Sequence, residues 1–367
     1  MKGLILSGGR GTRLRPVTHT SAKQLVPVAN KPILFYGIEQ MAEVGITEIG
    51  IIIGETGPDI REAVGDGSRW GVEVTYLPQD EPLGLAHCVM IAYDFLGDDN
   101  FVMYLGDNML EQGLEGLLNR FQADQDAVAQ LAIGGSNEPP AAHIVLSPVP
   151  DPHRFGVAEV DEDRVVRLSE KPADPPSNLA IVGVYLFTPA IHEAVRAIEA
   201  SPRGELEIVD AIQWLLDRGD VVHHDVLQGW WLDTGKKDSL LEANRRVLES
   251  LESSVEGKVD DDSDIDGRVV VDPTASIERS TVRGPAIIGA GARIVSAYVG
   301  PFTSVGADVA IASSEVENSV LLEGVRLEGV PRLVDSLIGR DTEVTRSGRP
   351  PRATRLLLGD HCSVDLS

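Results

Sequence analysis

The sequence has few cysteines, no long apolar run and a shortage of basic residues, and each shortage excludes a class of protein. Its two cysteines, Cys88 and Cys362, provide neither a disulfide framework nor a metal-ligand cluster, so both are expected to be reduced and structural. No run of 18 or more apolar residues occurs, and one lysine followed by a glycine-rich segment is not a signal-peptide pattern. We therefore expect no membrane partner and a cytoplasmic location.

Acidic residues outnumber basic ones, and the formal net charge is −25 at pH 7. Such a charge repels nucleic acid and anionic membranes, so neither is an expected partner. The first acidic residue is Glu39, however, and a group of cations precedes it. This cationic island suits a small anionic substrate, although chance clustering would produce the same pattern. Its members are Lys2, Arg10, Arg13, Arg15, Lys23 and Lys31.

The length of 367 residues predicts two domains, and the first 250 residues alternate short apolar runs with helical patterns. Such alternation is typical of an α/β domain with a mostly parallel sheet covered on both faces. Ligands of these folds lie beyond the carboxyl ends of the strands. The expected strands are Gly3–Leu6, Ile49–Ile53, Val72–Leu77, Phe101–Leu105, Ala127–Ile133 and Ala180–Phe187, and the expected helices include Pro32–Val44 and Gly84–Phe95.

A different pattern follows an expected charged helix, Lys236–Leu251, and an acidic connector at residues 260–262. Apolar residues then recur every five or six positions. Three consecutive spacings sum to 17 residues, so that Ile265, Val282, Val299, Val316 and Leu333 recur at a constant interval. Three short strands per coil, each with one inward aliphatic residue, describe a β-helix, whereas a β-sandwich with regular turns is the alternative. The inward positions are Ile265, Val271, Ile277, Val282, Ile288, Ile294, Val299, Val305, Ile311, Val316, Leu322, Leu327, Leu333, Ile338 and Val344.

A glycine-rich loop, Gly8-Gly9-Arg10-Gly11, follows the first expected strand. Glycines allow backbone N–H groups to approach phosphate oxygens without an intervening Cβ. A dinucleotide fingerprint would need a third glycine where Leu14 stands, and a Walker loop would need Gly-Lys-Ser/Thr, which does not follow here. The loop therefore belongs to another class of phosphate-binding loop.

The segment LSGGRGTRLRPVT, followed at Lys23 by KQLVPVANKPI, resembles the signature of sugar nucleotidyltransferases, specifically glucose-1-phosphate thymidylyltransferases. The likeness covers residues 1 to about 250, and the added repeats resemble the long form of these enzymes. It implies a Rossmann-like nucleotidyltransferase domain at 1–250, a left-handed parallel β-helix at 251–345 and a cap or tail at 346–367. The likeness continues through YLPQDEPLGLAH, YLGDNML, RFGVAEV, LSEKPADPPSN, AIVGVYLF, RGELEIVDAI and WWLDTG.

The resemblance assigns the triphosphate and a metal ion to particular residues. Arg13 would bind the triphosphate and offset charge on the α-phosphoryl group, with Lys23 as a second cation. Asp107 and Asp233 would hold Mg²⁺, because hard carboxylates suit that ion. A strand-end aspartate alone is commonly a cap or turn residue, and its pairing with the second aspartate motif favours the metal role. The phosphate-binding loop residues are Gly8, Gly9, Gly11 and Thr12.

The resemblance also assigns the base and the sugar. Gln79 would hydrogen-bond the pyrimidine, and Gly84 would leave space for it. Glu170 would accept sugar hydroxyls and Lys171 would bind the sugar phosphate, although a Glu-Lys pair is in general a solvated surface pair. The sugar pocket would be lined by Gly156, Ile181 and Val182.

The implied reaction is an in-line attack by glucose 1-phosphate on the α-phosphorus of dTTP, giving dTDP-glucose and pyrophosphate. The nucleophile is already an anion, so positioning and charge neutralisation replace a general base. None of the eight histidines stands in a motif for proton transfer. Thymine and uracil differ by one methyl group, so UTP in place of dTTP, or another hexose phosphate, stays open.

Two other functions are compatible with parts of the sequence. β-Helices also carry acetyl-CoA-dependent acyltransferases, but these normally use a histidine base, and Asp225 to Asp360 contains no histidine. The β-helix is therefore assigned to assembly or regulation, and a homo-oligomer is expected. A catalytically inactive regulatory subunit would be expected to lose the metal carboxylates or the loop arginine, which are present. Whether Arg10 and Arg15 contact phosphate or solvent stays open.

Overall fold

The computed structural model describes residues 1–9, 11–19, 21–131 and 139–346. Contacts within the chain divide it into two compact units, which are described separately below. The first unit comprises Met1–Arg10 and Leu34–Trp231, and the second comprises Gly11–Ile33 and Leu232–Ser367. Arg10 and all but the first residue of the expected cap or tail at 346–367 lie outside the described residues.

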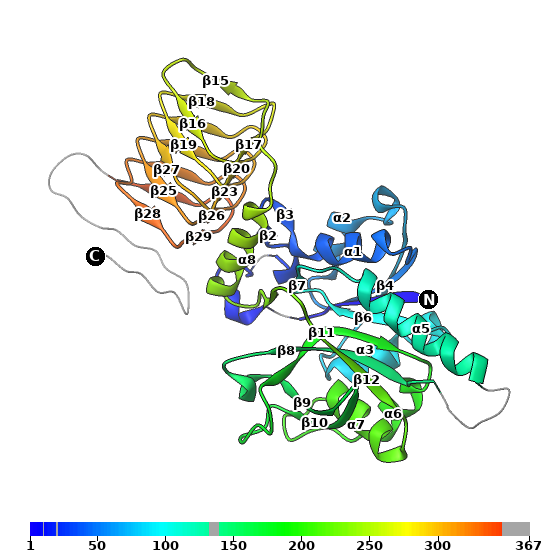
Figure 1. Cartoon of the computed structure of the whole chain (residues 1–367). Coiled ribbons are helices and arrows are strands. Elements are labelled where there is room, and N and C mark those ends of the chain that lie inside the picture. The colour runs from blue at the N-terminus through cyan, green and yellow to red at the C-terminus, as the bar shows by residue number, and fades with distance from the viewer. Residues whose placement is uncertain (10, 20, 132–138, 347–367) are drawn as a thin grey trace. The chain divides into compact units, whose positions relative to one another are not determined.

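A nine-stranded mixed sheet forms the centre of the first unit (Figure 1). Its strands are β1 (Lys2–Ser7), β4 (Glu48–Ile53), β5 (Glu73–Pro78), β6 (Phe101–Leu105), β8 (Ala142–Pro148), β9 (Gly156–Asp161), β10 (Arg164–Glu170), β11 (Leu179–Phe187) and β12 (Val222–Val226). The short strand β7 (Asn108–Leu110) is not part of this sheet. The sheet order is β5-β4-β1-β6-β11-β8-β12-β10-β9. The first four strands are parallel, and β11 joins β6 in the antiparallel direction. The predicted Rossmann-like α/β class is confirmed.

Helices cover both faces of this sheet. They are α1 (Ile33–Glu43), α2 (Gly57–Val64), α3 (Leu85–Ile91), α4 (Tyr93–Leu96), α5 (Glu115–Leu131), α6 (Ile191–Ala197) and α7 (Ile208–Arg218). Helices α3, α6 and α7 pack together on the face that buries Ala142, Ile144 and Leu146 of β8. Neighbouring residues of a strand point to opposite faces, so His143, between Ala142 and Ile144, points to the other face of the sheet. Helix α5 lies over that face, where its Asp124 contacts His143. No helix among the described residues is both long and apolar enough to cross a membrane.

The expected strand at Ala127–Ile133 is wrong. Residues 127–131 form the end of helix α5, which begins at Glu115, and residues 132 and 133 lie outside the described chain. A short apolar run has no periodicity that separates a strand from a buried helical segment. The expected helix at Gly84–Phe95 is divided at Ala92 into α3 and α4.

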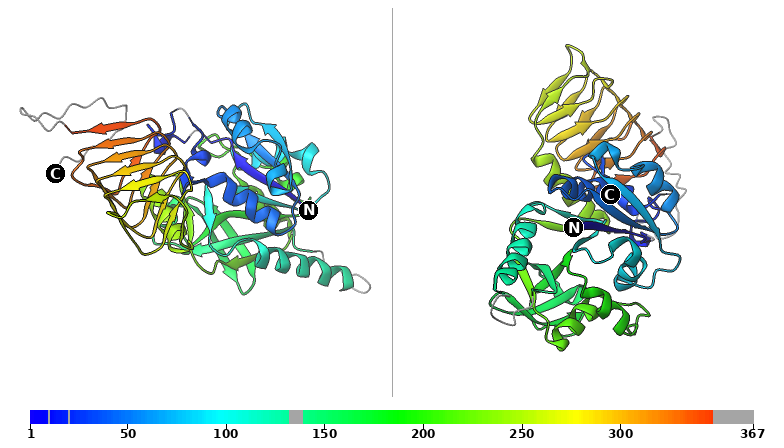
Figure 2. Two further views of the ribbon diagram at one scale, coloured as in Figure 1. Left: turned by 90° about the horizontal axis from the view of Figure 1, so that it is seen from above. Right: turned by 90° about the vertical axis from the view of Figure 1, so that its right-hand side faces the viewer.

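The second unit contains stacked coils of short parallel strands (Figures 1 and 2). The strands fall into three sheets, which is consistent with the predicted left-handed β-helix and excludes a β-sandwich. In one sheet the register joins Ile265 to Val282 to Val299 to Val316 to Leu333, which confirms the 17-residue interval.

The β-helix strands are β14 (Ser254–Val255), β15 (Lys258–Val259), β16 (Asp264–Asp266), β17 (Val269–Val271), β18 (Ser276–Glu278), β19 (Thr281–Arg283), β20 (Ala286–Ile288), β21 (Arg293–Val295), β22 (Tyr298–Val299), β23 (Thr303–Val305), β24 (Ala310–Ala312), β25 (Glu315–Glu317), β26 (Val320–Leu321), β27 (Arg326–Glu328), β28 (Leu333–Val334), β29 (Leu337–Ile338) and β30 (Glu343–Thr345). Two further strands, β2 (Pro27–Val28) and β3 (Lys31–Pro32), and helix α8 (Lys237–Glu249) belong to the same unit. Strand β13 (Trp231–Asp233) leads into this unit from the first.

One predicted inward residue of the β-helix is displaced by one position. Val305 pairs with Leu321, which in turn pairs with Ile338, so Leu321 occupies the core position that was expected for Leu322. Neighbouring residues of a strand point to opposite sides, and Leu322 therefore faces away from this row. The coil from Val305 to Leu321 is 16 residues long, so a strict interval of 17 residues predicts the wrong inward residue in this coil.

Asn244 of α8 connects three segments of the second unit. Its Oδ1 accepts hydrogen bonds from the backbone N–H of Ala29 at 2.9 Å and from Ser304 Oγ at 2.6 Å. Its Nδ2 donates to the carbonyl of Phe302 at 3.1 Å. Residues 11–33 and α8 therefore group with the β-helix, whereas the domain boundary at residue 250 stays a prediction.

Candidate active site

Three of the predicted site residues of the first unit follow the carboxyl ends of strands. Gly8 follows β1, Gln79 follows β5 and Asp107 lies in the turn after β6. With β4 these strands are consecutive and parallel in the sheet, so their carboxyl ends share one edge. Ligands of open α/β sheets bind at this edge, where the sequence pattern predicts them.

Gly8 and Gln79 are in direct contact. A Cβ atom on Gly8 would lie 2.8 Å from Gln79 Oε1, so a larger residue would displace the amide. The Nε2 of Gln79 donates to Cys88 Sγ and lies at the same distance, 3.3 Å, from His87 Nδ1. The buried hydroxyl of Ser7, one residue earlier, has no hydrogen-bond partner among the described residues. This combination leaves polar atoms for a ligand at the end of β1.

Gly84 precedes α3 with φ of 110°, a conformation that favours glycine. A Cβ atom there would lie 2.6 Å from the backbone nitrogen of Leu206 and closer still to its carbonyl oxygen. Leu206 also bonds through its backbone to Leu83 and Ala86. Glycine is therefore required at this position by a close approach of two backbones, in addition to any space that it leaves for a base.

Asp107 has a buried neighbour, Asn108, that orients its carboxylate. Asn108 is 3% exposed, and its Nδ2 donates to Asp107 Oδ1 at 3.1 Å. The indole N–H of Trp231 donates to Asn108 Oδ1 at 2.5 Å. Sequence reasoning gave Asn108 no role, although it stands in the YLGDNML segment that carried the resemblance.

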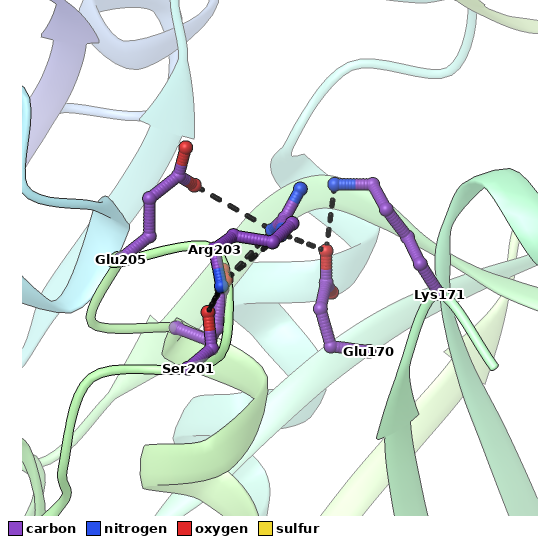
Figure 3. A network of polar contacts seen from close by, with 6 residues as sticks. Glu170, Lys171, Ser201, Arg203 and Glu205 are labelled. Carbon is purple, nitrogen blue, oxygen red and sulfur yellow. Dashed lines mark hydrogen bonds and ion pairs between the residues drawn. The ribbon is translucent and has the colours of Figure 1, made fainter.

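Glu170, Lys171 and Arg203 form a charged network at the end of β10 (Figure 3). The Lys171 ammonium lies 2.8 Å from Glu170 Oε1, and Arg203 Nη2 lies 3.2 Å from the same oxygen. Arg203 also bonds Glu207 at 2.6 Å, and Ser201 Oγ donates to Glu207 at 2.9 Å. Arg203 is a second residue that sequence reasoning missed, although it opens the segment RGELEIVDAI.

The carboxylates of this network carry excess negative charge. Burial raises the pKa of Asp210, and the charges of Glu207 and Glu170 raise the pKa further. Arg203 opposes this shift, because its guanidinium lies among the same carboxylates. The network is therefore a place where a cation, a hydroxyl donor or a proton is favoured.

The predicted sugar-pocket residues of the first unit meet at Gly156. A Cβ atom on Gly156 would lie 3.1 Å from Glu170 Oε2, 3.2 Å from Ile181 Cδ1 and 2.8 Å from Val209. The absence of a side chain therefore keeps the Glu170 carboxylate and Ile181 next to the backbone of β9. Val182 is fully buried in β11 and points to the face opposite Ile181.

Gly9 belongs to the first unit, like Gly8, whereas Gly11 and Thr12 belong to the second. Gly11 has φ of 62°, and a Cβ atom on it would lie 2.9 Å from Lys23 Cβ. Its carbonyl accepts a hydrogen bond from Thr18 Oγ1 at 2.7 Å, and Thr12–Leu14 follow as one 3₁₀ turn. Lys23 begins a second such turn at Lys23–Leu25. The fold of the loop thus brings Gly11 against Lys23, as a phosphate-binding role for both would require.

Arg13 and Asp233 approach each other at Gly235, also within the second unit. The backbone N–H of Gly235 donates to Asp233 Oδ1 at 2.9 Å. A Cβ atom on Gly235 would lie 2.9 Å from Asp233 Oδ1 and 3.6 Å from Arg13 Nη2. A predicted metal ligand and a predicted phosphate-binding cation therefore share one backbone turn.

One member of the cationic island does not contribute to this site. Lys2 lies at the amino end of β1, and its ammonium lies 3.2 Å from Asp99 and 4.0 Å from Glu48. It also donates to the carbonyl of Phe95 at 2.7 Å. The expectation that Lys2 belongs to an anion-binding group is wrong. Lys2 is close to the loop in sequence, but strand β1 is extended and separates the two, so that Lys2 lies at the opposite end of the strand.

Comparisons with known proteins identify the family of this chain. The family model described as nucleotidyl transferase matches residues 2–250. A glucose-1-phosphate thymidylyltransferase of Streptomyces griseus is 53% identical over 368 residues, which cover 100% of both chains. The low-salt glycan biosynthesis nucleotidyltransferase of Haloferax volcanii is 46% identical over 371 residues, again 100% of both chains.

A solved structure provides the corresponding comparison of folds. It is a Bacillus anthracis protein described as a glucose-1-phosphate thymidylyltransferase, with a TM-score of 0.61 and 33% sequence identity. The match covers 69% of this chain and 97% of that chain. By the family model and by full-length relatives, this chain belongs to the nucleotidyl transferase family and is a nucleotidyltransferase.

Proposed function

We propose that the protein transfers a thymidylyl group from dTTP to α-D-glucose 1-phosphate, releasing pyrophosphate and forming dTDP-glucose. The observation that carries the proposal is the full-length, 53% identical relative that is named as a glucose-1-phosphate thymidylyltransferase. The contact of Gly8 with Gln79, at the edge of the sheet that also presents Asp107, supports a nucleotide in this position.

The triphosphate is assigned to the loop and its cations. Backbone N–H groups of the loop receive phosphate oxygens, and Arg13 and Lys23 offset their negative charge. Arg13 and Lys23 act as catalytic residues, because charge grows on the leaving pyrophosphate during transfer. The loop residues with this role are Gly8, Gly9, Gly11 and Thr12.

The base is assigned to Gln79 and Gly84. The amide of Gln79 is held by His87 and Cys88, so its orientation is defined before a base binds. A pre-oriented amide donates and accepts in the pattern that a pyrimidine edge requires. Gly84 has no side chain and therefore leaves space for the base beside Gln79.

The sugar phosphate is assigned to the network of Glu170 and Lys171. The Glu170 carboxylate accepts sugar hydroxyls, and the Lys171 ammonium is a catalytic residue that binds the phosphate and orients its attacking oxygen. Gly156 and Ile181 form the wall of the sugar site, and Val182 contributes only its backbone, because its side chain points to the opposite face of the sheet. The contact of Gly156 with Glu170 and Ile181 supports this grouping.

Nucleotidyltransferases generally use a divalent metal, and we assign Mg²⁺ to Asp107 and Asp233. The donor set fits this ion, because two carboxylates are hard oxygen ligands and the orphaned hydroxyl of Ser7 at the end of β1 is a further polar atom. When bound, the ion supplies positive charge that neutralises the α-phosphoryl oxygens. Asn108 and the Gly235 N–H hold the two carboxylates in place.

These residues support an in-line displacement without a covalent enzyme intermediate. Lys171 presents the sugar phosphate oxygen, and Arg13 and Lys23 favour departure of pyrophosphate. No proton needs to be removed from the phosphate nucleophile, so no general base is assigned.

A matrix of nucleotides against sugar phosphates tests the substrates. dTTP, UTP, ATP and GTP are each combined with glucose, galactose or mannose 1-phosphate, and pyrophosphate release is measured. We expect the highest kcat/KM for dTTP with glucose 1-phosphate. UTP lacks the methyl group of thymine, and the kcat/KM for UTP is expected to be lower than that for dTTP by about 10- to 100-fold. A higher kcat/KM for another pair would replace the proposed substrates but not the nucleotidyl transfer.

The remaining assignments concern organisation. Residues 1–250 are assigned to catalysis, because the family model matches 2–250 and the Bacillus anthracis structure covers 69% of the chain. Residues 251–345 are assigned to assembly, in a homo-oligomer, or to regulation, and the enzyme is assigned to the cytoplasm, where nucleotides are available.

A further inference from the structure

A cluster of two histidines and an aspartate lies in the first unit, away from the residues assigned to the nucleotide. His143 and His223 are direct neighbours in the parallel pair β8 and β12, so both side chains point to the same face of the sheet. Helix α5 covers this face and brings Asp124 to both histidines. One ligand atom from each of the three residues lies within 4.8 Å of the others.

The nitrogen of His143 that faces the cluster has no hydrogen-bond partner. His143 is 1% exposed, and its Nδ1 is buried without a bond to any described residue. Its Nε2 lies 2.9 Å from Asp225 Oδ2. Because a carboxylate can only accept, Nε2 is the donor and the neutral ring presents a lone pair at Nδ1. An unsatisfied lone pair in a buried site is costly unless a ligand receives it.

Asp225 performs the supporting role that metal-binding histidines generally require. A carboxylate that accepts from the second nitrogen of a histidine fixes its tautomer and raises the basicity of the ligating nitrogen. Asp225 is itself held by an ion pair with Arg120, which stands one turn before Asp124 on α5. The Asp225 charge is therefore compensated, whereas the Asp124 charge faces two imidazoles.

We propose that Asp124, His143 and His223 bind a zinc ion. Imidazole nitrogens with one carboxylate favour zinc over the hard ions Mg²⁺ and Ca²⁺. Asp124 Oδ2 lies 2.8 Å from His223 Nδ1 and 3.8 Å from His143 Nδ1. Tetrahedral zinc with bonds of about 2.0–2.1 Å separates its ligand atoms by about 3.3 Å. These two distances would therefore each change by about 0.5 Å on binding, and the distance between the two histidine nitrogens, which is at most 4.8 Å, by up to about 1.5 Å.

The cluster is remote from the nucleotide edge of the same sheet. His143 and His223 lie near the amino ends of β8 and β12, which run parallel to β6 because both β6 and β8 are antiparallel to β11. The row that contains His143 continues to Leu186 and then to Val102, five residues before Asp107. At ~3.3 Å per residue this is roughly 16 Å along the strand. The ion would join α5 to the sheet and would not touch the substrates.

Zinc binding to the full-length protein tests the proposal. The protein is stripped with a chelator, returned to buffer with millimolar Mg²⁺ to occupy oxygen-rich sites, and titrated with zinc by calorimetry and thermal unfolding. We expect one zinc ion per chain and a melting temperature raised by about 5 °C at a hundredfold excess over Kd. Co²⁺ in place of zinc is expected to give the visible absorption of a four-coordinate site.

Variants separate this cluster from adventitious binding. Asp124→Asn and His223→Gln preserve shape and hydrogen bonding but supply poor zinc ligands, and each is expected to abolish the melting shift and the Co²⁺ spectrum. Asp126→Asn on the same helix and His224→Gln on the opposite face of β12 are the controls, and both should bind like the wild type. Wild-type protein without a stoichiometric site, or undiminished binding by folded Asp124→Asn and His223→Gln proteins, would overturn the proposal.

Discussion

The side-chain amide of Asn108 donates to Asp107 Oδ1 at 3.1 Å while its carbonyl oxygen accepts from Trp231 Nε1 at 2.5 Å. Both groups of a buried amide are therefore used to position a carboxylate that is assigned to the metal. Asn108→Asp would keep an acceptor for Trp231, but it would replace the N–H donor to Asp107 Oδ1 with a carboxylate oxygen that repels it, so Asp107 would lose its orientation. We expect a higher Mg²⁺ concentration for half-maximal activity, by about 10-fold.

Asn108→Ala is the matching variant for stability. It removes both hydrogen bonds and leaves the Trp231 N–H unpaired, which costs about 1–3 kcal/mol of folding free energy. If both variants change only the melting temperature and leave the Mg²⁺ dependence unaltered, Asn108 is a structural residue and does not position Asp107.

Asp107→Asn and Asp233→Asn each remove one charge from the proposed Mg²⁺ ligands. Each should lower kcat by about 100-fold or more, because several kcal/mol of transition-state stabilisation depend on the metal charge. Pyrophosphate release measures kcat, and circular dichroism checks that the variants are folded. Asp161→Asn, at the exposed end of β9, serves as the control; near-normal turnover in either ligand variant would contradict the metal assignment.

Arg13→Ala should act on the chemical step more than on nucleotide binding. Charge increases on the phosphoryl oxygens and on pyrophosphate in the transition state, so the loss should appear in kcat and in kcat/KM. Steady-state kinetics at varied dTTP concentration separates an effect on kcat from an effect on the KM for dTTP. Arg15→Ala is the comparison, and it also decides whether Arg15 contacts phosphate or solvent; a change confined to KM in Arg13→Ala would mean that this arginine only binds the nucleotide.

Arg203→Gln should loosen Glu170, because Arg203 Nη2 lies 3.2 Å from Glu170 Oε1 and 2.6 Å from Glu207. We expect KM for glucose 1-phosphate to rise by about 10-fold, because one charged hydrogen bond to Glu170 is lost, and KM for dTTP to stay unchanged. Arg167→Gln, on strand β10 with Glu170, removes a more exposed pair with Glu159 and should have no effect on either KM. Equal effects of Arg203→Gln on both substrates would point to a general loss of structure.

Cys88 should resist alkylation in the folded protein. Burial raises the pKa of its thiol to about 12, although the Gln79 amide partly opposes this. A raised pKa keeps the neutral thiol as pH rises, and at pH 8 the reactive thiolate is about a thousandfold scarcer than for a thiol with a pKa of 9.0. Iodoacetamide labelling followed by peptide mass spectrometry measures this, with urea-unfolded protein as the reference. Rapid labelling of Cys88 at pH 8 would show that the helix α3 region opens readily.

Local patterns predicted part of the site, and contacts between distant segments determined the rest. Gly8, Gln79 and Asp107 could be placed at strand ends because each follows a predicted strand, and alternating strands and helices predict a parallel sheet. Asn108 and Arg203 were visible in sequence motifs, but their roles depend on Trp231 and Glu207 being brought to them. Asp124, His143 and His223 are separated by 19 and 80 positions, and no spacing rule joins them before the sheet and α5 have formed.

The sequence by itself determined the β-helix, because every coil repeats the same local requirement for an inward aliphatic residue about every 17 positions. It also determined the α/β character of the first 250 residues, whereas the phosphate-binding role of the glycine-rich loop stays a prediction. Only the tertiary structure decided that residues 11–33 group with the β-helix through Asn244 rather than with the sheet. Hydrogen bonds of this kind join residues more than 200 positions apart, as Ala29 and Asn244 are, and they depend on the packed surface rather than on any periodicity.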